Sequence, residues 1–322
     1  MSVRLKIVYM GSSDFAVPAL AALHLEGFDI PFVVTQPDRM RGRGWKVQPT
    51  PVGLFAETNG LTALKPEYLK GNADFVRTLA EAAPNLIVVA AYGKILPKQL
   101  LELPPFGCVN IHASLLPEYR GAAPVQRAIL EGKQELGVTL VHMSERLDAG
   151  EMIAAASTDA SGMNAGELTD TLARMGAGLL IKMLPGLMAG TAPRIPQDEA
   201  KATYAEKVEK SEGRLDLRAS AKENEQRVRA MTPVPGAYLL RNGERIGVTQ
   251  VRVISPDDCE APKGAYEAAA PGTVLSVSEK GIGIRTGDGV LLVEALKAPG
   301  KKAMPVREYL KGNAFDTAKP LE

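Results

Sequence analysis

The chain has 322 residues, with 38 Lys and Arg against 37 Asp and Glu and a formal net charge of +1, which excludes a strongly basic, histone-like binder without excluding a local basic patch. A hydrophobic fraction of 45% with 23% charged residues is typical of a globular protein and argues against general disorder. The two cysteines exclude a disulfide scaffold and a cysteine-rich zinc module, so we expect a cytoplasmic protein without a metal, and the absence of any run near about 20 apolar residues predicts no membrane span.

The first half of the chain alternates short apolar runs with helical patterns. The apolar runs lack polar alternation, which is typical of strands that helices cover on both faces of a sheet. A strand–helix–strand succession implies right-handed crossovers and predicts a doubly wound, mostly parallel sheet of the Rossmann-like α/β class. An alternative is that one or two of the runs are buried helix segments. The predicted strands lie at residues 6–11, 29–37, 61–66, 86–93 and 108–114, and the predicted helices at residues 15–27, 51–60, 68–84 and 123–133.

The turn after the first predicted strand lacks the glycine spacing of a dinucleotide-binding loop. Its sequence from Met10 to Ala16 is MGSSDFA, which has no G-x-G-x-x-G pattern, and the chain contains no Walker loop. We therefore expect no dinucleotide in the usual position. Ligands of doubly wound sheets still bind beyond the carboxyl ends of the strands, so the polar residues that follow the apolar runs are the candidates for chemistry.

The alternation of strands and helices continues to about residue 190 and then stops. Strands are predicted at residues 137–143 and 151–158, and a long helix from Asn164 to Met188. From Thr191 the chain is rich in charge, contains two prolines and has no sustained apolar period. We interpret residues 191–210 as a linker that wraps over a first domain at residues 1–190.

The last part of the chain, residues 211–322, has the pattern of a small β domain. A polar helix is predicted at residues 219–231, and two β-rich runs follow it at residues 237–254 and 272–296. The runs are interrupted by RNGE, SEKG and TGDG, which are hairpin signals. Several short antiparallel strands predict a small barrel or a partly open sheet.

Two polar side chains alternate at the end of one predicted strand. Asn110 and His112 are two positions apart, so both project from the same face of that strand. Asp148 lies in the turn SERLDAGEM, just after the predicted strand at residues 137–143. We expect both strands to run in the same direction, so their carboxyl ends should meet at one edge of the sheet and the three side chains should converge in one crevice.

An amide, an imidazole and a carboxylate in one crevice suit attack on a carbonyl carbon. Asn110 can donate to a developing oxyanion, His112 can donate a hydrogen bond and transfer a proton, and Asp148 can orient the imidazole and favour its charged form. An oxyanion donor is worth about 10²–10³ in rate and general acid–base help about 10²–10⁴, so neither a metal nor a covalent intermediate is required. The alternative is purely structural, with His112 as a hydrogen-bonding group at a strand end and Asp148 as a turn residue.

These segments resemble the folate-dependent formyltransferase family. The pattern Asn-x-His-x-Ser-Leu-Leu-Pro at residues 110–117, followed by GVTLVHMSERLDAGEMI at residues 137–153, is long and specific. Other segments match in the same order, so the similarity spans nearly the whole chain, and it is strongest to the members that act on charged initiator tRNA. Those segments are KIVYMGSSDFAVPAL, VVTQPDRMRGRGWKVQPTPV, VVAAYGKILP, MTPVPGAY, GTV, TGDGVLLVEAL and GKKAM.

The resemblance implies formyl transfer from 10-formyltetrahydrofolate to the α-amine of methionine esterified to initiator tRNA, for translation initiation. It assigns the catalytic roles to Asn110, His112 and Asp148. It further implies a formyltransferase domain at residues 1–190 and an OB-like, tRNA-binding domain at residues 211–322, with no protein partner. The residues implied to bind the folate are Ser114, Leu115, Leu116, Pro117, Ala91, Tyr92, Gly93, Leu147 and Gly150.

The segment DRMRGRGWKVQ, residues 38–48, is the leading candidate for contact with RNA. Arg41, Arg43 and Lys46 lie among two glycines, and Trp45 supplies a stacking surface. The resemblance implies that this segment enters the acceptor-stem region of the tRNA, with Arg43 as the leading contact. The alternative is a solvated surface loop.

Three lysines elsewhere are further candidates for contact with tRNA. Lys301 and Lys302, in GKKAM, are expected to contact phosphates, with an effect that weakens as salt rises. Lys207, in the linker, is a weaker candidate.

Two other functions stay open on the sequence. One is formyl transfer to an amino sugar nucleotide or to glycinamide ribonucleotide, which the basic segment and the lysine pair disfavour. The other is a non-catalytic RNA-binding module, which the intact set of Asn110, His112 and Asp148 disfavours.

Overall fold

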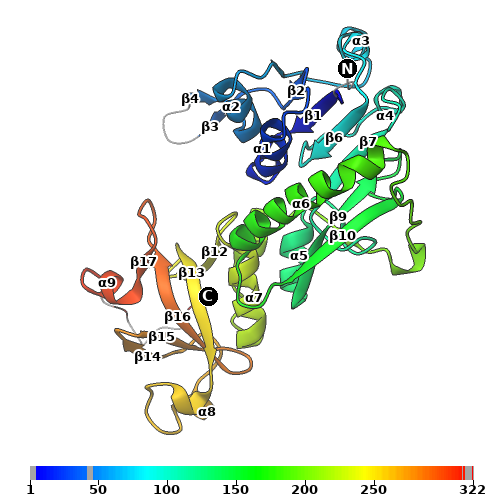
Figure 1. Cartoon of the computed structure of the whole chain (residues 1–322). Coiled ribbons are helices and arrows are strands. Elements are labelled where there is room, and N and C mark those ends of the chain that lie inside the picture. Colours follow the sequence, from blue (N-terminus) through cyan, green and yellow to red (C-terminus); the bar gives the residue numbers. More distant parts are fainter. Residues whose placement is uncertain (1–4, 42–45, 314, 316–320, 322) are drawn as a thin grey trace. The chain divides into compact units, whose positions relative to one another are not determined.

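The computed structural model describes residues 5–41, 46–313, 315 and 321, and the chain forms two compact units (Figure 1). The first unit comprises Met1–Pro124, Glu135–Asp159 and Thr169–Ala205, and the second comprises Val125–Gln134, Ala160–Leu168 and Glu206–Glu322. Two short pieces that precede residue 190 therefore belong with the second unit. The domain ranges 1–190 and 211–322 stay a prediction.

The first unit contains a seven-stranded sheet in the order β10-β9-β7-β6-β1-β2-β5. The pairs that join β5, β2, β1, β6 and β7 are all parallel, which confirms the expected doubly wound, mostly parallel α/β fold. Every residue of β1 and β6 is buried, as is typical of strands covered on both faces. The strands are β1 (Ile7–Gly11), β2 (Val33–Val34), β5 (Ala63–Leu64), β6 (Leu86–Ala90), β7 (Cys108–His112), β9 (Glu135–His142) and β10 (Met152–Asp159).

The helices follow the predicted positions, and local caps shorten some of them. The predicted helix at residues 68–84 begins only at Ala73, because the Asn72 side chain accepts from the Phe75 N–H at 3.1 Å and caps the helix there. The long helix runs unbroken to Met188 with Pro185 inside its last turn. The helices are α1 (Val17–Leu25), α2 (Pro51–Thr58), α3 (Ala73–Glu81), α4 (Lys98–Leu101), α5 (Pro124–Leu130) and α6 (Ala165–Met188).

The direction of β9 corrects one expectation. β9 pairs antiparallel with β7, with His142 opposite Val109 and Thr139 opposite His112, so the end of β9 lies beside the start of β7. The premise that both strands end at the same edge was wrong. The reason is the connection between them: a right-handed crossover needs a helix that packs back over the sheet, whereas α5 from Val125 onward belongs to the second unit. Without that crossover, the chain returns antiparallel, and β10 continues the reversal.

The segment after α6 packs against the first unit as far as residue 205. Ile195 forms an isolated bridge with Met152 of β10, and β11 (Tyr204–Ala205) pairs parallel with β8 (Arg120–Gly121). We call residues 195–205 the strap. All of the strap belongs to the first unit.

The second unit is built on an antiparallel sheet in the order β12-β13-β16-β15-β14, with β17 paired to β16. The three hairpin signals are confirmed: the first joins β12 to β13 through Asn242 and Gly243, whose φ angles of 51° and 77° match a type I′ turn. Among the described residues, β12 and β14 lie at the two ends of this order and do not pair with each other. The elements are α7 (Ala221–Met231), β12 (Ala237–Arg241), β13 (Glu244–Ile254), α8 (Ala265–Ala268), β14 (Val274–Ser278), β15 (Gly281–Arg285), β16 (Val290–Lys297), β17 (Met304–Pro305) and α9 (Val306–Leu310).

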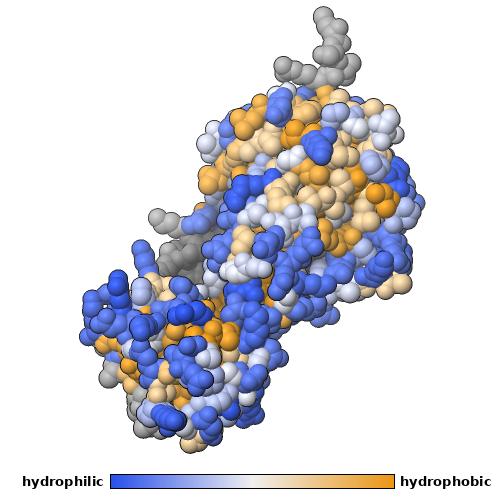
Figure 2. Space-filling view, turned by 60° about the horizontal axis from the view of Figure 1, so that its bottom comes forward, coloured by the Kyte–Doolittle hydropathy of each residue, from blue (hydrophilic) through white to orange (hydrophobic). Residues whose placement is uncertain are grey.

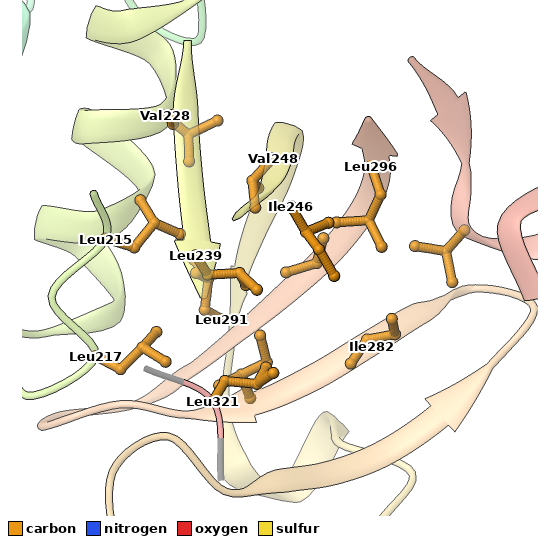
Figure 3. Close-up of a cluster of buried hydrophobic side chains, with 14 of the residues drawn as sticks. Leu215, Leu217, Val228, Leu239, Ile246, Val248, Ile282, Leu291, Leu296 and Leu321 are labelled. Carbon is orange, nitrogen blue, oxygen red and sulfur yellow. The ribbon is translucent and has the colours of Figure 1, made fainter. Parts of the chain in front are cut away.

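The core of the second unit lies between the sheet and α7 (Figure 3). α7 begins with a capping box, in which the Ser220 hydroxyl accepts from the Glu223 N–H at 3.1 Å and the Glu223 carboxylate accepts from the Ser220 N–H at 2.8 Å. Val228 then points from the helix toward strand residues that are almost fully buried. The labelled side chains of this cluster are Leu215, Leu217, Val228, Leu239, Ile246, Val248, Ile282, Leu291, Leu296 and Leu321.

Large hydrophobic residues at the surface come from separate elements. Leu25, Ile95 and Val234 are more than 70% exposed and lie far apart in the chain. On the face in Figure 2, hydrophilic residues lie between the hydrophobic ones. Of the helices in the described part of the chain, none combines the length and the apolar character needed to cross a bilayer.

The buried thiol of Cys108 predicts a loss of stability at alkaline pH. Burial raises the pKa of Cys108 to about 12 from 9.0. The folded state keeps a proton that the unfolded chain releases, so the stabilisation is complete below pH 9.0 and falls by about 1.4 kcal/mol per pH unit as the pH rises from there toward 12. Between pH 8 and pH 10.5, the free energy of unfolding in urea should fall by about 2 kcal/mol more in the wild type than in Cys108→Ala. Tyr9 and Tyr92 are present in both proteins and cancel; equal losses in the two proteins would contradict the prediction.

Candidate active site

Asn110, His112 and Asp148 come together at the carboxyl end of β7. Asn110 and His112 project from the same face of the strand, as their spacing predicts. The Asp148 Oδ2 atom lies 3.7 Å from Nδ1 of His112, and Asp148 Oδ1 lies 3.4 Å from Nδ2 of Asn110. The expected convergence is present, but its route differs: the chain leaves β9 beside the start of β7, and residues 143–150 then fold back so that Asp148 reaches both side chains.

The surroundings of His112 determine which ring nitrogen carries a proton. The imidazole is buried, and its Nε2 lies 2.9 Å from the carbonyl oxygen of Tyr119. A carbonyl oxygen only accepts, so Nε2 must donate. Nδ1, which faces Asp148, is therefore the nitrogen that holds no proton in the neutral ring. A proton at Nδ1 would place an imidazolium beside the carboxylate.

The Asp148 carboxylate is held by the backbone as well as by the two side chains. The Gly121 N–H donates to Oδ2 at 2.9 Å. Asp148 itself has a φ of 48°, in the left-handed region that is strained for a residue with a Cβ atom. Tyr119 and Ala91, which border the site, have φ angles of 58° and 40°. Strained backbone of this kind persists only where surrounding contacts impose it, and it clusters at functional sites.

Gly150 allows the Asp148 segment to pack against the end of β9. A Cβ atom at this position would lie 1.7 Å from the carbonyl oxygen of His142. The Gly150 φ angle is not in the left-handed region, so the requirement for glycine comes from close approach and not from backbone conformation. The segment that carries Asp148 can fold back along this path only if residue 150 has no side chain.

The Ser114–Pro117 segment, which the resemblance implies binds folate, is held by its own hydrogen bonds. The Ser114 hydroxyl donates to the Glu118 carbonyl at 2.6 Å, and Thr139 of β9 donates to the Ser114 carbonyl at 2.7 Å. The Leu116 N–H in turn donates to the Thr139 hydroxyl at 3.1 Å. Leu116 is buried, whereas Leu115 and Pro117 are half-buried. The segment therefore has a defined shape, and the Ser114 side chain serves that shape.

The second expected folate segment, Ala91–Gly93, leaves the sheet beside β7. β6 ends at Ala90, opposite Ile111, so Ala91 begins at the level of His112. Ala91 and Gly93 are exposed, whereas the Tyr92 side chain is buried in the core and burial raises its pKa to about 12. The Tyr92 carbonyl accepts from Nε2 of Gln36 at 2.8 Å. Tyr92 therefore supports the segment, and its phenol stays neutral at ordinary pH.

Leu147 lies next in the chain to one member of the trio formed by Asn110, His112 and Asp148. Its side chain is 58% exposed, and it directly precedes Asp148. Leu147, Ala91 and Gly93 are thus the exposed members of the set expected to bind folate. In the described part of the chain, no three His, Cys, Asp or Glu side chains are grouped so that they could hold a metal ion.

The basic residues expected to contact RNA are only partly described. Arg43 lies outside the described residues, and Arg41 and Lys46 are described only as paired backbone in the hairpin of β3 (Arg39–Arg41) and β4 (Lys46–Gln48). Lys207, Lys301 and Lys302 are exposed and belong to the second unit. Lys301 and Lys302 lie in the turn between β16 and β17.

Sequence reasoning missed several residues that hold the trio. Tyr119 and Gly121 bond to His112 and Asp148, and Gln197 of the strap donates to the Asp148 carbonyl at 2.8 Å. Tyr119 and Gly121 lie in the segment SLLPEYRGAAP, whose proline and glycine content did indicate a shaped loop. No signal in the sequence marked Gln197, because it acts only through a contact with a residue about 50 positions away.

Comparisons with known proteins identify the same family over both parts of the chain. A model described as formyl transferase matches residues 4–184, and one described as formyl transferase, C-terminal domain, matches residues 207–314. The chain is 44% identical over 318 residues to methionyl-tRNA formyltransferase of Halorhodospira halophila, covering 98% of this chain and 99% of that protein. It is 42% identical over 309 residues to the methionyl-tRNA formyltransferase of Moorella thermoacetica, covering 96% of each.

Solved structures share the fold at much lower identity. HypX from Aquifex aeolicus in complex with tetrahydrofolic acid aligns with a TM-score of 0.62 and 18% identity over 96% of this chain and 47% of that one. An N-formyltransferase from Helicobacter canadensis, in complex with folinic acid and dTDP-3-aminofucose, aligns with a TM-score of 0.64 and 16% identity over 90% of this chain and 98% of that one. At these identities the likeness concerns the fold alone.

Two glycine substitutions test the packing of the Asp148 segment. Gly150→Ala should lower the free energy of unfolding by about 1–3 kcal/mol, because the new methyl group overlaps the His142 carbonyl. Gly178→Ala is the matched control: its Cβ atom would meet nothing within 4 Å on the exposed side of α6, so it should be neutral or stabilise by up to about 1 kcal/mol. Urea denaturation of both variants measures the difference. Equal stabilities for the two variants would contradict the tight approach at residue 150.

Proposed function

This chain belongs to the formyl transferase family, and from that premise we propose that it transfers the formyl group of 10-formyltetrahydrofolate to the α-amine of methionine on charged initiator tRNA. The observation that carries the proposal is the convergence of Asn110, His112 and Asp148 at one strand end. The acceptor is inferred from relatives that match nearly the whole chain and are named methionyl-tRNA formyltransferase. The activity would prepare this tRNA for translation initiation in the cytoplasm.

Asn110, His112 and Asp148 would stabilise the transition state as the neutral amine attacks the formyl carbon. The distances of 3.4 and 3.7 Å from Asp148 to Asn110 and His112 are longer than good hydrogen bonds. The donors at Asn110 Nδ2 and at protonated His112 Nδ1 can therefore turn toward a formyl oxygen placed between them as it gains negative charge. Hydrogen bonds that form only with that charge lower the barrier without tightening the ground state.

Asp148 would receive the proton that the amine loses. As the new carbon–nitrogen bond forms, the amine nitrogen becomes positively charged and must release a proton. The Asp148 carboxylate can receive it through a water molecule. When the old bond to the folate nitrogen breaks, that nitrogen takes up a proton, so no net proton is gained or lost.

We assign the folate-facing surface to the two segments that flank the trio and to the residues beside Asp148. Ala91, Leu147 and Gly93 would offer apolar surface and main-chain hydrogen bonds to the fused ring. Ser114–Pro117 would form the opposite side through its fixed backbone shape. The full proposed set is Ala91, Tyr92, Gly93, Ser114, Leu115, Leu116, Pro117, Leu147 and Gly150.

We also propose that six basic residues contact phosphates of the tRNA. Arg41 and Lys46 belong to the paired strands β3 and β4, Arg43 lies outside the described residues, and Lys207, Lys301 and Lys302 are exposed on the second unit. Cations that contact phosphates release counterions, so their contribution to affinity falls steeply with salt.

Replacing the carboxylate tests the chemical role of Asp148. Asp148→Asn should lower kcat by about 10²–10⁴ and change the KM for 10-formyltetrahydrofolate by less than about threefold, because the shape remains while proton transfer is lost. Mass spectrometry of methionine released from the tRNA measures the added CO unit. Asp74→Asn is the matched control, since its exposed carboxylate pairs with Arg77 on the surface of α3 and its loss should leave kcat unchanged.

Two outcomes would overturn the proposal. A wild-type protein that does not formylate charged initiator tRNA would remove the proposed activity. Formyl transfer that survives ribonuclease treatment of an extract would assign the acceptor to a small molecule, such as an amino sugar nucleotide or glycinamide ribonucleotide.

The lysine pair on the second unit tests the proposed tRNA contact. Replacing Lys301 and Lys302 together by Ala should raise the KM for charged tRNA about 5–10-fold, leave the KM for folate unchanged and reduce the salt slope by about 2. Lys280→Ala is the control, since Lys280 is an exposed lysine that pairs with Glu260 at 2.6 Å. Equal effects of the pair on both substrates would contradict a tRNA contact.

A further inference from the structure

Among the described residues, Arg120 has one of the largest side chains that are fully buried, and it lies between the two residues that bond to His112 and Asp148. Tyr119, on one side of it, accepts the hydrogen bond from His112, and Gly121, on the other side, donates to Asp148. Any shift of the backbone at Arg120 would therefore move a partner of the imidazole and a partner of the carboxylate together. The restraint on Arg120 is thus also a restraint on the active site.

Among the described residues, the side-chain partners of Arg120 come from the strap. Its Nε and one terminal nitrogen donate to the Gln197 side-chain oxygen at 3.0 and 2.8 Å. Its two terminal nitrogens also donate to the carboxylate of Glu199 at 3.2 and 3.0 Å. The guanidinium is therefore bound on two edges, which fixes its orientation as well as its position.

The backbone of the strap follows the same three residues. The Arg120 N–H donates to the Thr203 carbonyl at 2.9 Å, and the Tyr119 N–H donates to the Thr203 hydroxyl at 2.8 Å. Gly121 has a φ of 122°, and a Cβ atom there would lie 2.7 Å from the Ala205 carbonyl, so the strap and this turn are in close contact.

Gln197 connects this restraint to the segment that carries Asp148. While its side-chain oxygen accepts from Arg120, its Nε2 donates to the Asp148 carbonyl and to the Gly150 carbonyl, both at 2.8 Å. One side chain thus joins the buried arginine to both ends of the Asp148–Gly150 turn. Since Asp148 has a left-handed φ, an external restraint of this kind is what such a conformation requires.

We propose that Gln197 is a positioning residue for formyl transfer, which holds Asp148 in register with His112 by linking the Asp148–Gly150 turn to Arg120. The inference rests on the proposed function. The strap lies between the two ranges that the family models match, residues 4–184 and 207–314. The proposal therefore gives a role in catalysis to a part of the chain outside both ranges.

The test separates positioning from simple anchoring of the strap. Gln197→Ala removes all four hydrogen bonds of the amide. Gln197→Glu keeps an oxygen for Arg120 to bind, but beside that arginine it stays ionised and cannot donate to the two carbonyls. Positioning predicts that both variants lose kcat about 10–100-fold, as a displacement near 1 Å can produce, while the KM values for folate and tRNA change by less than about threefold.

The control is an ion pair between the residue before the strap and the residue after the Asp148–Gly150 turn. Arg194 precedes the strap and pairs with Glu151 at 2.7 Å on the surface, so Arg194→Ala should retain wild-type kcat. Thermal denaturation of each variant shows whether it is folded at the assay temperature, and a folded Gln197→Glu protein alone is enough for the test.

Each outcome has one meaning. A wild-type kcat in Gln197→Glu, or a loss confined to KM, overturns the positioning role while leaving the proposed function intact. An inactive wild-type protein overturns the proposed function, and the inference with it. A selective loss of kcat in Gln197→Glu, with Arg194→Ala unchanged, supports it.

Discussion

The position of the Asp148 carboxylate is the feature on which the proposed active site depends. Its side chain is only 13% exposed, and a charge so far removed from water is stable only where donors surround it. The Gly121 N–H donates to it at 2.9 Å, and the Asn110 amide and the His112 imidazole, both from β7, lie 3.4 and 3.7 Å away. The two side chains of β7 are also those that we propose turn toward the formyl oxygen. The same two side chains therefore face the carboxylate and would serve the proposed reaction.

The sheet supplies a rigid frame for this arrangement, and its reversal at β9 completes it. The parallel strands β6 and β7 place Ala91 and His112 at one edge, as their shared direction dictates. β9 then returns antiparallel, and residues 143–150 fold back over the end of β7, along a path open only because residue 150 is glycine. The strap crosses the outside of this turn and bonds to it through Gln197. The strap residue that makes these two hydrogen bonds therefore lies about 50 positions after the turn in the chain.

The second unit is organised by local signals to a greater degree. Its turns, its capping box at Ser220 and Glu223 and its alternating strands each follow from a few neighbouring residues, and its core gathers side chains from α7 and the sheet. A unit of this kind can present Lys301 and Lys302 from a turn without cost to its core, since turns lie outside the packed layer. The near-neutral net charge of the chain is consistent with RNA contact through a few local cations rather than through a general basic surface.

The sequence by itself determined the buried strands, the hairpins and the common face of Asn110 and His112, because these depend on periodicity and turn chemistry within a few residues. It also marked Asp148 as a partner, through the pattern that resembles the formyltransferase family. Only the tertiary structure decided the direction of β9, the ring nitrogen of His112 that holds its proton, and the link from Gln197 to Asp148. Each of these depends on contacts between separate segments of the chain. The antiparallel direction of β9 follows from α5 joining the other unit. A carbonyl or an amide that comes from another segment produces no local sequence pattern that predicts the contact.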